Sequence, residues 1–385
     1  MINFLQRYVC INTAYPNPDY QSVIALFKKH ALDDGFLVNE LLLPSGNPML
    51  IVTMLGSSFE LPSLALNHHM DVVPADNLDE WRFPPFSGTV SEGLIYGRGT
   101  QDCKGLGVAQ YAALKMLKQK QLNTQRTIHL IMVPDEERGG FHGTKEFVEH
   151  PIFSSLNIGY VLDEGMPSAS NRELLIKVDE RTPIQIRVTS SGLQAHACEL
   201  FAQNCVHVLT DFLAKIVTFN LAQQRLVGLH QPGELICMHI TSLSANNGAL
   251  NVIPSQAQAT IDIRIPSRLS LDEGIALIDS LLQDYTTITY EILATSKERF
   301  KPIKSESIFY KTLAQAVLDY NLTPKPFVFQ ATTDARFYTH RGIQVIGFTP
   351  FSVVPNLHGT DEHISIKDLD QGTTILYTFL HSFCM

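Results

Sequence analysis

Three carboxylates stand side by side in the segment VPDEERGG, residues 133–140: Asp135, Glu136 and Glu137. The segment follows the apolar run IHLIMV and precedes two glycines. Adjacent carboxylates repel one another, so the end of a strand gains no stability from them. The segment is therefore either a solvated loop or one side of a site that binds positive charge.

A histidine and an aspartate stand two positions apart at the end of another apolar run, LALNHHMDVVP. In an extended segment His69 and Asp71 point to the same side, and His68 points to the opposite one. Asp71 can then accept the free ring N–H of His69 and hold the tautomer that binds a metal. A structural histidine is the alternative.

Further acids and a second histidine occupy three other turns. IYGRGTQDCKG places Asp102 in a glycine-rich turn before a helix, where it is either a helix N-cap or a carboxylate aimed at a ligand. VLDEG supplies Asp163 and Glu164, and NLHGTDE supplies His358 and Glu362. Oxygen and imidazole ligands favour Zn²⁺ in an open catalytic site, with Co²⁺ or Mn²⁺ as alternatives.

The elements that would position these turns alternate between strand and helix over residues 1–165. Apolar strands are predicted at 49–55, 61–69 and 127–133, and a helix at 103–119,. This alternation predicts an α/β sheet with helices on both faces. Ligands of such sheets bind at the carboxyl ends of the strands, which is where the acidic turns stand.

The pattern changes near residue 180. Strands at 182–190, 234–243, 257–265 and TITYEIL, with helices at 203–218 and 271–284, follow the order β-α-β-β-α-β of a ferredoxin-like α+β sandwich,. The chain of 385 residues is also longer than one core usually supports,. We therefore expect a discontinuous catalytic domain, residues 1–179 and 298–385, interrupted by an inserted domain at 180–297.

Composition argues against several classes of function. A formal charge of −9 and the lack of a dense Lys/Arg block argue against nucleic acid as a partner,. The N-terminus lacks the pattern of a secretory signal, and no window approaches the ~18 apolar residues of a membrane span. Six scattered cysteines without a CxxC pair predict reduced thiols in a cytoplasmic protein,.

Taken in order, the motifs HxDVVP, GRGxxDxKG, DEExGG, DEG and HxxDE resemble those of a family of two-zinc amidohydrolases and peptidases. The family includes aminoacylase, succinyl-diaminopimelate desuccinylase and the glutamate carboxypeptidases, and the resemblance covers essentially the whole chain. VPDEERGGFHGTKEFV, VLDEGMPSA and LNVIP are similar in wording to the aminoacylases. The resemblance implies a zinc-peptidase catalytic domain with an inserted lid and dimerisation domain.

The resemblance also implies a ligand set. One zinc ion would be bound by His69 and the acid of VLDEG, where the spacing after Glu137 favours Glu164 over Asp163. Glu137 and His358 would bind the second zinc ion. Asp102 would bridge the two ions.

The chemistry implied is hydrolysis of the amide bond of an N-acyl-L-amino acid to a carboxylate and a free amino acid. Two zinc ions would lower the pKa of a bridging water toward ~7, so that hydroxide attacks the acyl carbonyl. Glu136 would be the general base and Asp71 the partner of His69. A dipeptidase, carboxypeptidase or desuccinylase is the alternative, because these enzymes share the ligands.

Residues outside the metal motifs would complete the site. The resemblance implies that His196, in GLQAHA, is a second donor to the oxyanion, and in relatives it reaches the active site of the opposite subunit of a homodimer. A structural histidine near a strand end is the alternative. The substrate carboxylate needs a cation, for which Arg264 is favoured, with Asn251 and Arg336 as further candidates. Structural salt bridges are the alternative for both arginines. Cys103 stands where methionine is usual; it could coordinate a metal, but its place next to Asp102 favours a position in the core.

Overall fold

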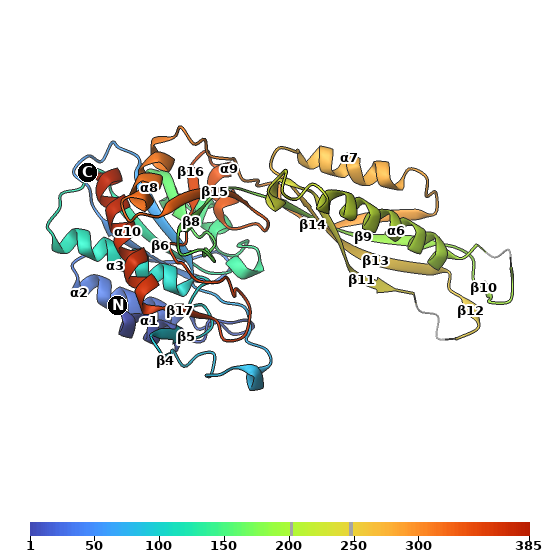
Figure 1. Ribbon diagram of the computed structural model, residues 1–385, viewed down its shortest axis with the longest axis horizontal. Coiled ribbons are helices and arrows are strands. Elements are labelled where there is room, and N and C mark those ends of the chain that lie inside the picture. Colours follow the sequence, from blue (N-terminus) through green and yellow to red (C-terminus); the bar gives the residue numbers. More distant parts are fainter. Residues whose placement is uncertain (201–202, 246–248) are drawn as a thin grey trace. The chain divides into compact units, whose positions relative to one another are not determined.

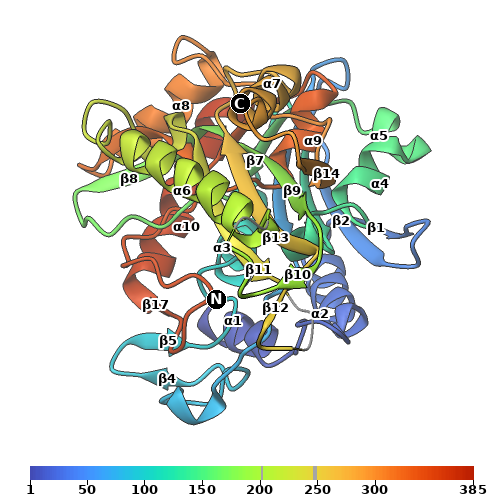
Figure 2. The same ribbon diagram turned by 90° about the vertical axis from the view of Figure 1, so that its right-hand side faces the viewer.

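The chain divides into two compact units in the computed structural model, which describes residues 1–200, 203–245 and 249–385 (Figures 1 and 2). The first unit comprises Met1–Val178, Ile303–Phe327 and Thr333–Met385. The second comprises Asp179–Pro302 and Val328–Thr332. The first unit is therefore assembled from three separate stretches of sequence.

One large sheet forms the base of the first unit and has eight strands within the described residues. Their order is β1 (Leu37–Leu42), β2 (Pro48–Met54), β6 (Ile128–Val133), β3 (Ser63–His69), β7 (Ile158–Asp163), β16 (Gln344–Gly347), β8 (Glu173–Glu180) and β15 (Thr323–Phe329). The central strands β6, β3, β7 and β16 run parallel. Every residue of β2, β3 and β6 is buried, as is typical of strands covered on both faces,.

Helices cover both faces of this sheet, so the predicted α/β class is confirmed. One core contains side chains of α1 (Ile2–Val9), α2 (Tyr20–Asp33), α3 (Lys104–Gln119), α8 (Ile308–Leu318) and α10 (Ile366–Cys384). His68 lies on this side, with its ring beside Tyr8 and Phe27. The neighbouring Asn67 points to the other face and accepts a hydrogen bond from Tyr338 of α9 (Ala335–His340). On that face α9 contacts α4 (Thr144–Glu149), which contacts α5 (Pro151–Ser155).

A small sheet ties two distant segments of the first unit together. It consists of β4 (Val90–Ser91), β5 (Leu94–Tyr96) and β17 (His363–Ser365). The antiparallel pairing of β17 with β5 sets His363 opposite Tyr96. The loops that follow β5 and precede β17 are therefore neighbours.

The second unit is built on an antiparallel sheet that has four strands in the described part of the chain. Its order is β11 (Cys237–Ser244), β13 (Gln256–Ile265), β9 (Thr182–Ser191) and β14 (Ile288–Thr295). Helices α6 (Cys205–Gln224) and α7 (Leu271–Leu282) contribute buried side chains to its core. Along the chain the elements follow the order β-α-β-β-α-β. A separate two-stranded pairing joins β10 (Ala195–His196) to β12 (Val252–Ile253).

Helix α6 corrects the expectation that no segment is apolar enough to span a membrane. By length and composition it could do so, because Asp211 and Lys215 are the only Asp, Glu, Lys or Arg residues among its 20. Leu209, Phe212 and Ile216 lie in the core of the second unit. One such helix is a weak indication of a membrane, since the core helix of a soluble protein has the same properties.

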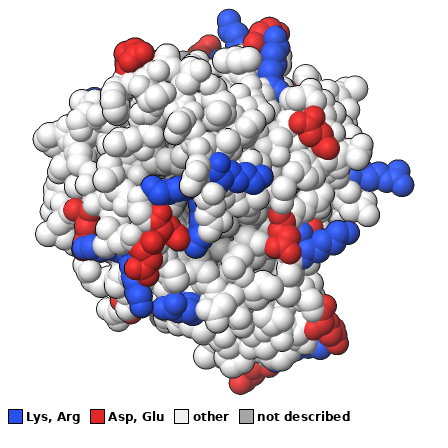
Figure 3. All heavy atoms as spheres, turned by 90° about the vertical axis from the view of Figure 1, so that its left-hand side faces the viewer, with Lys and Arg blue, Asp and Glu red and all other residues white. Residues whose placement is uncertain are grey.

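Charged side chains of both signs are interspersed on the face shown in Figure 3. Basic and acidic groups lie in small mixed clusters separated by uncharged surface. Exposed pairs such as Lys28 and Glu40, 2.9 Å apart, typically contribute no more than about 1 kcal/mol each,. Stability therefore depends mainly on the buried sheets.

We expect acid to destabilise the first unit through His129. Its ring is 4% exposed and lies between Thr53 Oγ1, 2.9 Å from Nδ1, and Leu156 O, 3.2 Å from Nε2. Burial lowers the pKa of His129 to about 4. The ring is therefore protonated at a lower pH in the folded state than in the unfolded state, where its pKa is ~6.5. The contribution of His129 to the free energy of unfolding is fully present above the unfolded-state pKa. Below that pKa, each pH unit of acidification toward 4 removes about 1.4 kcal/mol of it.

Urea denaturation of the wild type and of His129→Gln, at several pH values between neutral and about 4.5, measures this effect. The variant should be less stable at neutral pH. Its free energy of unfolding should nevertheless fall less steeply as the pH is lowered, because about one proton fewer is taken up on unfolding. Parallel curves for the two proteins would contradict the assignment.

Candidate metal centre

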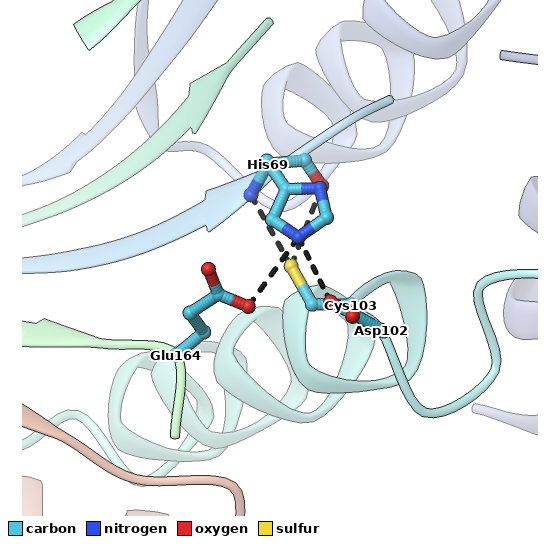
Figure 4. A group of neighbouring side chains, drawn as sticks. All are labelled: His69, Asp102, Cys103 and Glu164. Carbon is cyan, nitrogen blue, oxygen red and sulfur yellow. Dashed lines mark hydrogen bonds and ion pairs between the residues drawn. The ribbon is translucent and has the colours of Figure 1, made fainter. Parts of the chain in front are cut away.

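Three side chains meet where β3 and β7 end. His69 closes β3, Glu164 follows β7, and Asp102 stands just before α3. Because β3 and β7 are adjacent and parallel, their carboxyl ends bring His69 and Glu164 to the same edge of the sheet,. His69 Nε2 lies 3.0 Å from Asp102 Oδ1 and 3.4 Å from Glu164 Oε2 (Figure 4).

A second group shares Asp102 with the first. His358 Nε2 lies 3.4 Å from Asp102 Oδ2 and 3.2 Å from Glu137 Oε2. Glu137 follows β6, which is the other parallel neighbour of β3. In each group the donor atoms all lie within 4.8 Å of one another. Asp102 presents one carboxylate oxygen to each histidine, which is the arrangement expected of a bridging ligand.

The donor set fits divalent metal ions. Asp102, Glu136, Glu137 and Glu164 lie close together, and none forms an ion pair with Lys or Arg among the described residues. Glu137 Oε1 is buried and has no hydrogen-bond partner in the described part of the chain, although buried polar atoms normally have one,. Metal ions would supply both the positive charge and the partner. Imidazole and carboxylate donors bind Zn²⁺, Mn²⁺ and Co²⁺.

The acids of the site differ in their affinity for protons. Burial, reinforced by Asp102, raises the pKa of Glu164 to about 8. Burial and then Glu164 raise the pKa of Glu136 well above its ordinary value. Burial also acts on Asp102, but hydrogen bonds from His358 and His69 outweigh it and lower the pKa of Asp102. Glu136 belongs to neither donor group, so it is an acid beside the centre whose protonation is favoured.

Asp71 makes a different contact from the one predicted. Nδ1 of His69 lies 2.9 Å from the backbone carbonyl of Asp71, whereas the carboxylate is 3.8 Å away. The Asp71 carboxylate instead accepts hydrogen bonds from the backbone N–H groups of Glu136, at 3.2 Å, and Glu137, at 3.0 Å. The residue thus orients His69 through its backbone and the two glutamates through its side chain.

Asp135 stabilises the other side of the loop that follows β6 and carries Glu136 and Glu137, here called the glutamate loop. Its carboxylate accepts hydrogen bonds from the Tyr15 hydroxyl and the His142 backbone N–H, both at 2.8 Å. Its backbone is left-handed, with φ of 72°. The three adjacent acids therefore contact different groups, and Asp135 is part of the loop structure.

A buried ion pair connects the loops that carry Asp102 and His358. Glu362 accepts hydrogen bonds from Arg98 Nη1 at 2.8 Å and from the backbone N–H groups of Gly99, Gln101 and Asp102. Arg98 also donates to the carbonyl of His358 at 3.1 Å. Glu362 thus positions Asp102 from outside the donor groups. Sequence reasoning missed Arg98, although its place between two glycines in the Asp102 turn was a signal.

Cys103 is both a core residue and a neighbour of the first donor group. It is 1% exposed and belongs to the hydrophobic core, as predicted. Its sulfur also accepts a hydrogen bond from the His69 backbone N–H at 3.2 Å and lies within 4.8 Å of the donors of that group. The thiol therefore contacts the backbone of a candidate ligand.

Two further predicted residues of the first unit lie outside the donor groups. Asp163, the alternative to Glu164, accepts a hydrogen bond from Asn67 at 2.8 Å and lies 3.7 Å from Lys177. Arg336 is 5% exposed and donates to the carbonyls of Thr333 and Gly139. Gly139 follows the glutamate loop, so Arg336 supports the turn that ends it.

The remaining predicted residues belong to the second unit. Asn251 Nδ2 lies 3.3 Å from His196 Nε2, and both side chains are exposed. Arg264 makes two contacts with Asp262, at 2.6 Å and 3.1 Å. In this structure Arg264 is therefore in a salt bridge on its own strand.

Comparison with known proteins places this architecture among hydrolases. Residues 65–382 match peptidase family M20/M25/M40. Mouse (Mus musculus) aminoacylase-1 is 30% identical over 388 residues, which cover 99% of this chain and 94% of the relative. Succinyl-diaminopimelate desuccinylase of Blochmanniella floridana is 28% identical over 82% of each chain. An M20 family metallo-carboxypeptidase from Sulfolobus solfataricus has the same fold, with a TM-score of 0.76 over 98% of each chain and 16% identity.

The fold, the donor groups and these matches define a metal-dependent hydrolase. The chain belongs to peptidase family M20/M25/M40.

We expect Glu362→Gln to lower the metal affinity of the second donor group, although the substitution removes none of its donor atoms. The amide loses the charge that pairs with Arg98 and cannot accept all the backbone hydrogen bonds. Loss of such a supporting contact typically lowers metal affinity by about 10- to 100-fold. Metal content measured after dialysis against graded chelator should show preferential loss of one ion per chain. Exposed Glu60→Gln is the matched control, and unchanged affinity for both ions in folded Glu362→Gln would refute the positioning role.

Proposed function

We propose that this chain is an amidohydrolase that cleaves N-acyl-L-amino acids into a carboxylate and a free amino acid. The observation that carries the proposal is the pair of donor groups sharing Asp102, with the unligated Glu136 beside them. The similarity to mouse aminoacylase-1 over nearly the whole chain supports the substrate class.

Two zinc ions would be the cofactor, with Co²⁺ or Mn²⁺ as substitutes. His69 and Glu164 would hold one ion, Glu137 and His358 the other, and Asp102 both. When bound, such ions lower the pKa of water and polarise the substrate carbonyl.

Glu136 would move the proton of the reaction. As a carboxylate it takes a proton from the attacking water, and it then delivers that proton to the leaving amine nitrogen. Its buried position beside Glu164 favours the protonated form that the second step needs. The Asp71 carboxylate holds the backbone of Glu136 during both steps.

The predicted inserted domain, residues 180–297, makes up most of the second unit and would be a lid and dimerisation domain of a cytoplasmic homodimer. The adjacent and exposed His196 and Asn251 support a role in contacting a substrate oxyanion or a second subunit. Arg264 would bind the substrate carboxylate in exchange for Asp262, with Arg336 acting through the glutamate loop. Six free cysteines support a reducing compartment,.

A peptidase or desuccinylase is the second candidate. One solved structure of the same fold is that of an M20 family metallo-carboxypeptidase, and the desuccinylase of Blochmanniella floridana matches 82% of the chain. The metal centre would be the same in each case, because the substrates differ mainly in the acyl group.

A substrate panel on the zinc-loaded enzyme separates these candidates. We expect kcat/KM for N-acetyl-L-methionine to exceed that for dipeptides, N-succinyl diamino acids and folate-like glutamates by at least about tenfold. N-acetyl-D-methionine is the matched control, because it differs only in the configuration at the α-carbon. Failure to hydrolyse any N-acetyl amino acid would remove the substrate assignment.

Replacing the proposed base should separate binding from turnover. We expect Glu136→Gln to retain two metal ions per chain and lose activity by about 10²–10⁴-fold, the usual contribution of a general base. Glu146→Gln in α4 is a control of the same chemistry outside the centre. Wild-type turnover in Glu136→Gln would show that another group moves the proton.

A further inference from the structure

A pocket of about 200 Å³ lies within the second unit, and its residues are distinct from those of the metal centre. It is formed where the last turns of α6 meet the start of β11 and residue 330. Among the side chains that line it are Arg181, Asn220, Gln223, Gln224, Cys237 and Gln330. The wall therefore combines one guanidinium and several amides with the imidazole of His239 and the apolar side chains of Val227, Pro232, Leu235 and Ile236.

Arg181 is a buried cation that forms no ion pair among the described residues. It is 7% exposed, and burial lowers its pKa. Nε donates to Gln330 O at 2.7 Å, and Nη1 lies 3.2 Å from both Leu235 O and Cys237 Sγ. No carboxylate of the described residues forms an ion pair with it. By contrast, Arg98 pairs with Glu362 and Arg264 with Asp262.

The charge of Arg181 is compensated only in part, because Asp262 acts on it from beyond ion-pair distance and is itself paired with Arg264. A buried charge without a close partner is energetically unfavourable, and proteins normally pair it. Nη2 of Arg181 has no hydrogen-bond partner among the described residues, so one edge of the guanidinium is available. Gln223 accepts from the Ile236 backbone N–H through Oε1, which leaves its amide N–H₂ as a donor. The pocket thus offers positive charge and N–H donors.

We propose that this pocket binds a small carboxylate anion, with Arg181 as its charged anchor. A planar guanidinium binds a carboxylate more specifically than it binds a spherical ion. The volume suits a molecule between acetate and a small amino acid in size. The site stands whether or not the proposed hydrolysis is correct, because the two share no residue.

Cys237 provides a local reporter, because its sulfur lies on the pocket wall beside Arg181. Iodoacetate is itself a small carboxylate, and iodoacetamide is its neutral counterpart. Both alkylate thiols with loss of iodide and a proton. Peptide mass spectrometry on the full-length metal-loaded enzyme measures the two rates at each cysteine. The exposed Cys10 and Cys198 are internal controls.

We expect the iodoacetate-to-iodoacetamide rate ratio at Cys237 to exceed that at both controls by at least about tenfold, because binding places the reagent beside the thiol. The rate should saturate with iodoacetate, and acetate or glycine should compete. Arg181→Gln should abolish the preference. The exposed Gln224→Glu should abolish it by repulsion while leaving Arg181 in place.

Three results would each overturn the proposal. These are a ratio equal to that of the controls, a rate that rises linearly with iodoacetate without protection by acetate, and a Cys237 that reacts with neither reagent. A linear rate would mean that the nearby charge attracts the reagent without a binding site.

Discussion

Repulsion among carboxylates at one edge of the sheet is the constraint on which the first unit depends. Asp102, Glu136, Glu137 and Glu164 lie together, and within the described part of the chain none of them pairs with Lys or Arg. Two like charges 4 Å apart repel by about 4 kcal/mol at an effective dielectric constant of 20. Local preferences do not overcome energies of this size. The parallel strands β6, β3 and β7, buried among the helices, hold the acids in place, and divalent ions would then be bound by a site that is already formed.

Acidic residues perform two opposite tasks around this edge. The candidate ligands leave oxygens available to a metal, as Oε1 of Glu137 shows. Asp71, Asp135 and Glu362 instead direct their oxygens at backbone N–H groups of the loops that carry the ligands. Charge-assisted hydrogen bonds of this kind are strong enough to fix a loop. Residue type alone therefore does not tell a ligand from a residue that positions one.

Several residues show how far prediction from sequence could go. His69, Asp102, Glu137, Glu164 and His358 were all named from motif and strand-end position, and the structure brings them into two adjacent groups. The backbone N–H partners of the Asp71 carboxylate were not predicted, because two-residue spacing describes one strand and these donors lie on another loop. The pairing of Arg98 with Glu362 spans 264 positions in sequence, beyond the reach of any local pattern. Helix α6 is more apolar than expected, because only a few charged residues interrupt its hydrophobic segment.

The sequence by itself determined the α/β class, the order of the elements, and which side chains stand at strand ends. These follow from hydrophobic period and turn chemistry, which are properties of neighbouring residues. Only the tertiary structure decided which charges are paired. It joined Arg264 to Asp262, buried Arg336 against two carbonyls, and gave Arg181 no ion pair among the residues that the structure describes. The physical reason is that an ion pair needs contact within about 4 Å, and the fold alone sets which distant residues come that close.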